Sequence, residues 1–223
     1  MSSRDLILGR VRAALRDAPP AVAPVPRDYR REFPAADLEI LVDRLVDYKA
    51  EVYRVPPSEV AATVTAITSR AAAASAPASS AAGNDAAVSR DAAVLVPPGL
   101  PEAWRPAGAF PDDGLAPDRI AAADAVLTAA AVAVAETGTI VLDASPDQGR
   151  RIITLLPDVH IIVLRPSQVV ASVPEAVARL TPGRPLTWIS GPSATSDIEL
   201  NRVEGVHGPR HLHVILLEGD DGD

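Results

Sequence analysis

The sequence predicts an α/β fold: one domain built on an open, mostly parallel sheet flanked by helices, with an N-terminal helical arm. Short apolar runs alternate with segments of helical periodicity, which is typical of parallel strands joined by crossover helices. Residues 161–164 are apolar at consecutive positions, as expected for a central strand covered on both faces. A length of 223 residues leaves room for one ordinary domain with a buried core.

The composition excludes several classes of protein. Hydrophobic residues make up 48% of the chain but aromatic residues only 3%, so the core is expected to be aliphatic. A net charge of −8, without clustered cations, argues against a nucleic-acid partner. The chain has no cysteine and therefore cannot itself ligate an iron–sulfur cluster. Because no apolar run is long enough to cross a bilayer and residues 1–16 lack the features of a secretory signal, we expect a cytoplasmic protein without a membrane span.

Three segments are expected along the chain. Residues 1–34 form a helix and a proline-rich arm, because Leu6, Val11 and Leu15 recur at helical spacing and prolines follow from residue 19. Residues 35–218 form the α/β domain. Residues 219–223 form an acidic tail.

The domain is expected to begin with a helix, a strand, an Ala-rich helix and a buried strand, at residues 35–48, 51–55, 56–74 and 92–96. The low complexity of residues 75–90 predicts a loop, and the prolines between residues 100 and 118 predict an irregular segment.

The second half is expected to alternate more regularly. Strands are predicted at residues 125–128, 139–142, 159–164, 186–190 and 212–217. Helices are predicted at residues 147–156, 174–180 and 197–201, with a small turn or helix through residue 134.

Residues 188–199 carry the first candidate site. An apolar strand breaks at Gly191 and Ser193 and is expected to reopen as a helix after Thr195, Ser196 and Asp197. The first backbone N–H groups of a helix lack internal acceptors, and the helix dipole adds positive charge, so a carboxylate or phosphate could bind there. The alternative is that these polar residues only cap the helix.

A histidine flanked by glycines follows this segment. Because His207 lies between Gly205 and Gly208, it could act as an acid, a base or an anion contact. A metal site with His211 and His213 is disfavoured, since the Gly-Pro pair after His207 breaks any helix and the spacing fits no standard zinc set. His211 and His213 share one face of the last predicted strand, where they are expected to line its edge.

The segment before residue 139 and a later arginine complete the candidates. Gly138 lets the backbone approach a ligand, and Glu136 beside Thr137 supplies a carboxylate that could be a nucleophile, base or acceptor. The alternative for Glu136 is an ordinary surface turn. One arginine of the pair Arg150 and Arg151, for which we choose Arg151, could hold an anionic substrate, although a salt bridge at a helix start explains the pair at least as well.

Four blocks, at residues 135–142, 155–161, 190–199 and 205–209, together resemble the LUD-domain family of the lactate utilization protein C type. The resemblance is strong from about residue 120 to 218 and weak before that. Residues 195–199 read Thr-Ser-Asp-Ile-Glu, where the family usually has Thr-Ala-Asp-Ile-Glu. The resemblance implies a fold similar to glucosamine-phosphate isomerase, ribose-phosphate isomerase and CoA transferases, with sites at the carboxyl ends of strands.

The resemblance also implies a function: a subunit that acts with iron–sulfur proteins in oxidising L-lactate to pyruvate. We expect no cofactor and no metal on the chain itself, and a small carboxylate or phosphate in a crevice formed by Glu136, Ser193 and His207. Glu136 and His207 are then the catalytic candidates, and the binding candidates are Thr137, Gly138, Arg151, Gly191, Ser193, Thr195, Ser196, Asp197 and Gly208. Two alternatives remain: a stand-alone CoA-transferase-like or isomerase-like enzyme that uses Glu136, and a non-catalytic interaction module.

Overall fold

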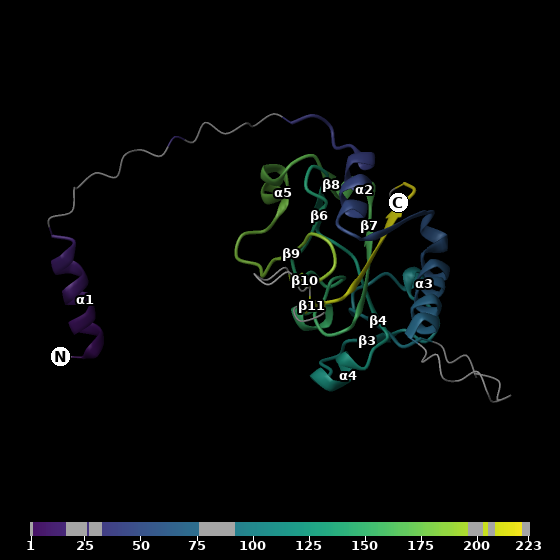
Figure 1. Ribbon diagram of the computed structural model, residues 1–223, viewed down its shortest axis with the longest axis horizontal. Coiled ribbons are helices and arrows are strands. Elements are labelled where there is room, and N and C mark those ends of the chain that lie inside the picture. Colours follow the sequence, from purple (N-terminus) through teal and green to yellow (C-terminus); the bar gives the residue numbers. More distant parts are fainter. Residues whose placement is uncertain are drawn as a thin grey trace. The chain divides into compact units, whose positions relative to one another are not determined.

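The computed structural model describes residues 2–16, 26, 33–75, 92–195, 203–204 and 208–219 (Figure 1). The chain divides into two compact units, residues 1–32 and 33–223. Across these described ranges, every helix is too short or too polar to cross a membrane.

The described residues of the first unit form one helix, α1 (Ser3–Ala14). It begins with a capping box: the Ser2 hydroxyl accepts from the Asp5 amide at 3.2 Å, and the Asp5 carboxylate accepts from the Ser2 amide at 3.0 Å. The predicted N-terminal helix is therefore confirmed. Its apolar side chains at Leu6 and Val11 are exposed. Most of the predicted proline-rich arm lies outside the described residues.

A six-stranded sheet forms the centre of the second unit, in the order β1-β12-β7-β4-β2-β3. Every neighbouring pair is parallel, which confirms the predicted fold class. The strands are β1 (Glu51–Val55), β2 (Val94–Val96), β3 (Phe110–Pro111), β4 (Ala125–Thr128), β7 (Val159–Leu164) and β12 (His211–Leu217).

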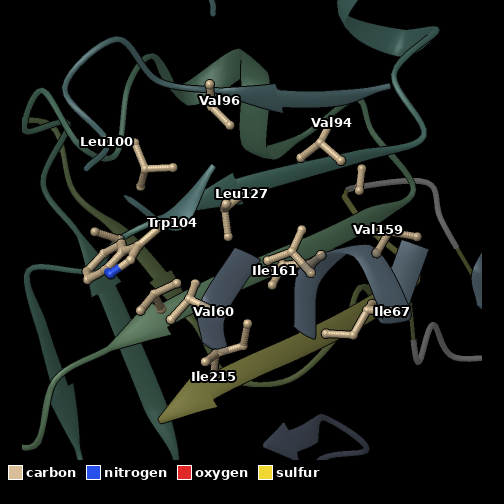
Figure 2. Close-up of a cluster of buried hydrophobic side chains, with 14 of the residues drawn as sticks. Val60, Ile67, Val94, Val96, Leu100, Trp104, Leu127, Val159, Ile161 and Ile215 are labelled. Carbon is tan, nitrogen blue, oxygen red and sulfur yellow. The ribbon is translucent and has the colours of Figure 1, made fainter. Parts of the chain in front are cut away.

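Helices cover both faces of this sheet. On one face, α3 (Val60–Ser75) packs Val60 and Ile67 against Ile161 and Ile215, as Figure 2 shows. On the other face, α2 (Leu38–Asp47) packs Leu41 and Leu45 against a second set of strand residues, Ile162, Leu164, Val214 and Leu216. Successive strand residues point to opposite faces, so burial on both sides explains the apolar run at 161–164.

A second sheet, in the order β8-β5-β6-β9, packs on the same face as α2. Its strands are β5 (Val132–Val134), β6 (Thr139–Leu142), β8 (Val169–Val170) and β9 (Thr187–Ile189). The prediction of a turn or helix through residue 134 is wrong, because β5 pairs with β6 and β8. Val132 and Val134 face a separate small core while Ala133 faces α2, so all three residues are buried.

The remaining helices are short. They are α4 (Pro117–Ala121), α5 (Val173–Arg179), η1 (Pro57–Glu59), η2 (Glu102–Trp104), η3 (Arg151–Thr154) and η4 (Pro166–Gln168). The helix predicted at residues 147–156 is reduced to η3, because Gly149, at φ +72°, belongs to a turn that closes on the Ser145 carbonyl. The helix predicted at residues 174–180 is confirmed by α5, whereas the one at 197–201 lies outside the described residues.

Candidate functional site

A cavity of about 140 Å³ lies at the amino ends of β7 and β12. We call it the Arg151 cavity. Its walls come from η3, from these two strand ends and from the chain on either side of Gly191 and Gly208. Its polar side chains are those of Arg151, Thr154, His160, Thr187, Ser190 and Ser193, and no carboxylate is among its described lining residues.

Arg151 supplies the positive charge of this cavity. Its guanidinium donates to the Thr154 hydroxyl at 3.1 Å. Burial lowers the pKa of Arg151, but an arginine remains charged at neutral pH. In the described part of the chain no carboxylate lies within ion-pair distance of this guanidinium, so its charge is uncompensated.

Three other arginines in the described part of the chain have acidic partners. Arg150 makes a two-point bond to Asp112, at 2.7 and 2.6 Å. Arg210 makes a similar two-point bond to Asp158, at 2.6 Å for each contact. Arg184 forms a longer ion pair with Asp143, at 3.5 Å. Arg151 therefore differs from the arginines around it in being available to an incoming anion.

His160 contributes a neutral polar group. The imidazole is buried in β7, and its Nε2 lies 2.9 Å from the Thr128 hydroxyl. Burial, and then the positive charge of Arg151, lower the pKa of His160 from 6.5 to about 3. The ring is therefore uncharged at physiological pH, and Arg151 carries the positive charge of the cavity.

Tight contacts fix the chain after β9. Gly191 has φ +84°, and a Cβ atom there would lie 2.6 Å from the carbonyl oxygen of Tyr48. Two residues later, the Ser193 amide donates to the Pro209 carbonyl at 2.8 Å. These contacts bring three predicted binding residues, Gly191, Ser193 and Gly208, to the wall that faces Arg151.

Only the first part of the predicted turn from strand to helix lies within the described residues, and the helix predicted at residues 197–201 does not. After Ser193 the chain enters β10 (Ala194–Thr195), which pairs antiparallel with β11 (Val203–Glu204). The Ser193 amide is already bonded, and among the described lining residues the positively charged group is Arg151. Ser196, Asp197 and His207 lie outside the described residues.

Glu136 and Thr137 line a separate, open hollow of about 490 Å³ beside the end of α2. A Glu136 carboxylate oxygen accepts from the Val173 amide at 3.4 Å. Gly138, at φ +59°, approaches α2 so closely that an added Cβ would lie 2.7 Å from Cβ of Arg44. The structure thus brings Ser193 and Arg151 together but places Glu136 in a different hollow.

A chain of hydroxyl groups nevertheless connects the two places. Thr137 donates to the Thr139 hydroxyl at 2.9 Å, and the Thr139 and Ser190 hydroxyls lie 2.8 Å apart. The Arg151 cavity lies at the amino ends of the parallel strands β7 and β12, whereas the family resemblance implies sites at the carboxyl ends of strands.

Sequence reasoning missed His160, Thr154 and Ser190 as lining residues. The available signal was a single histidine inside the otherwise apolar run 159–164. His213 was expected at a strand edge, but β12 lies between β1 and β7, and His213 is buried with Nδ1 3.4 Å from the Tyr53 hydroxyl. Among the residues with assigned positions, no cluster of three His, Cys, Asp or Glu side chains could hold a metal ion.

These features define an α/β protein with a small cavity whose described lining residues include one arginine and no acid. The model of the LUD domain matches residues 38–217, and the chain belongs to this family, as the resemblance predicted. A crystal structure of a DUF162 family protein from Deinococcus radiodurans is similar, with a TM-score of 0.62 and 37% identity over 81% of this chain and 95% of that chain.

Curated relatives carry the name lactate utilization protein C. The protein from Deinococcus radiodurans is 53% identical over 131 residues, which are 56% of this chain and 62% of the relative. The protein from Bacillus subtilis is 35% identical over 99 residues, 41% of each chain. The matched stretches therefore span between about two fifths and three fifths of these relatives.

Proposed function

We propose that this chain serves lactate utilization by binding a small monocarboxylate in the Arg151 cavity. In this proposal it is a subunit of a system that oxidises L-lactate to pyruvate, and iron–sulfur partner proteins accept the electrons. The name shared by its relatives supports the pathway. The observation that carries the binding proposal is the unpaired charge of Arg151 in a cavity whose described walls contain no acid.

Charge matching favours a monoanion. A guanidinium binds a carboxylate through two parallel hydrogen bonds, and each is stronger than a bond between neutral groups. Because His160 is neutral, one carboxylate balances Arg151, whereas a second negative charge would find no positive partner among the described lining residues. The hydroxyls of Ser190 and Ser193 can donate to or accept from an oxygen on the second carbon of the ligand.

The size of the Arg151 cavity agrees with a small monocarboxylate as the ligand. Its volume of about 140 Å³ is below the roughly 300–1,000 Å³ of pockets that hold drug-sized ligands. Lactate and pyruvate have only six heavy atoms each.

Oxidation of lactate to pyruvate releases two electrons and two protons. This chain has no cysteine with which to ligate an iron–sulfur cluster, so in this proposal the partner proteins accept the electrons.

Calorimetric titration with L-lactate and pyruvate tests the proposal. Replacing Arg151 by Gln removes charged hydrogen bonds, so we expect at least a tenfold loss of affinity. Arg119→Gln is the matched control, because Arg119 is an exposed arginine on α4 that does not line the cavity. Equal affinities in all three proteins, or no binding by the wild type with or without iron–sulfur partners, would refute the proposal.

A further inference from the structure

A second cavity adjoins the first. It has a volume of about 200 Å³, and we call it the Leu186 cavity. Arg151, Thr154 and Thr187 line both cavities, so the two meet at these residues. Beyond them, the wall of the Leu186 cavity is formed largely by Leu142, Ala144, Pro185 and Leu186.

Arg150 and Gln148, two polar residues of the Leu186 cavity, are already engaged. Arg150 is neutralised by Asp112 through two hydrogen bonds. The Gln148 side chain accepts from the Asp143 amide at 2.6 Å and donates to the Asp147 carboxylate at 3.3 Å. An aliphatic group can therefore cover the apolar part of this cavity. Among its described lining residues, Arg151 is the one charged group without an opposite charge beside it.

We propose that the two cavities form one site with two parts, whose ligand is a 2-hydroxy or 2-oxo monocarboxylate with a longer aliphatic chain than lactate. The inference rests on the proposed function, because it uses the same arginine. Arg151 lies at the junction and binds the carboxylate. The 2-oxygen faces the hydroxyls of the Arg151 cavity, and the chain extends past Thr187 toward Leu186.

Chain length then controls affinity. Burying a methylene group against apolar side chains strengthens binding by about fourfold. Two added methylenes are therefore expected to tighten binding by roughly tenfold to twentyfold over pyruvate. A site that consisted of the Arg151 cavity alone would show no such gain, because longer chains would project into solvent.

Calorimetric titration with pyruvate, 2-oxobutanoate, 2-oxopentanoate and 2-oxohexanoate tests this inference. The wild type should bind each longer acid more tightly, by about fourfold per methylene. Leu186→Ser should abolish most of that gain and leave the affinity for pyruvate unchanged. Leu186 is 41% exposed, so the variant is expected to fold. The matched control is Val177→Ser, since Val177 is an exposed aliphatic residue on α5 that lines neither cavity.

The outcomes separate the two proposals. If pyruvate binds in an Arg151-dependent manner but longer acids bind no more tightly, the two-part site is wrong and the proposed function stands. A gain that persists in Leu186→Ser also overturns the inference, because the chain then lies elsewhere. If none of the four acids binds, both proposals fail.

Discussion

The buried imidazole of His160 makes stability sensitive to mild acid. The unfolded chain takes up a proton on this ring below pH 6.5, whereas the folded chain resists protonation until about pH 3. A histidine with a lowered pKa in the folded state destabilises that state as pH falls, because the unfolded state binds more protons. The loss begins near pH 6.5 and continues toward pH 3.

The size of the effect follows from the two pKa values. At pH 5 the ring is almost fully protonated in the unfolded chain and almost fully neutral in the folded one. This difference lowers the free energy of unfolding by about 2 kcal/mol relative to pH 7.5. His213, whose pKa burial also lowers, acts in the same direction, so the contribution of His160 has to be isolated by substitution.

Urea unfolding of the wild type and of His160→Gln at pH 7.5 and pH 5 isolates the contribution of His160 to the pH dependence of stability. Between these two pH values the wild type should lose about 2 kcal/mol more than the variant. His213 and the carboxylates are common to both proteins and cancel in this comparison. The lost bond to Thr128 lowers the stability of the variant at both pH values and cancels as well. Equal losses in the two proteins would refute the account of a buried, neutral His160.

Three further experiments test other parts of the structure. Lys49 adopts φ +70° immediately after α2, where glycine is preferred, so Lys49→Gly should raise the free energy of unfolding by about 1 kcal/mol; thermal melting that shows no gain would contradict this. Gly191→Ala places a Cβ at positive φ and against Tyr48, so it should lower the free energy of unfolding in urea by roughly 2–4 kcal/mol. The control Gly183→Ala, at φ +87° with open space around it, should lower it by about 1–2 kcal/mol. Equal losses would refute the clash with Tyr48. Glu136→Gln should leave pyruvate affinity within twofold in calorimetry, because Glu136 lies outside the Arg151 cavity; a tenfold loss would place it in the site.

The parallel sheet could be predicted because its central strands are long and apolar on both faces. The run at residues 161–164 has this character only because α3 and α2 cover opposite sides of β7. The second sheet could not be predicted in the same way. Its strands β5 and β8 contain three and two residues, which are too short for periodicity to separate a strand from a turn.

Part of the candidate site was also predictable. Arg151, Gly191, Ser193 and Gly208 were named from the sequence, and the structure brings them to one cavity. The distinction between Arg150 and Arg151 could not be predicted, because it depends on Asp112, which lies 38 residues before Arg150 in the chain and beside it in space.

The position of His160 beside a cavity could not be predicted from the sequence for a similar reason. A single histidine in an apolar strand has the same pattern whether it fills the core or borders a cavity. Its position became clear only when η3 and the chain after β9 were placed around the amino end of β7. Glu136 is the opposite case. Its place two residues before Gly138 suggested that the backbone there approaches a ligand, whereas in the structure Gly138 approaches α2.

A crystal structure of the protein with bound pyruvate tests the central claim most directly. The account predicts carboxylate density within about 2.7–2.9 Å of the Arg151 guanidinium, with the 2-oxygen directed toward the Ser190 and Ser193 hydroxyls. Density for pyruvate beside Glu136 and Arg44, with the Arg151 cavity occupied only by water, would contradict it.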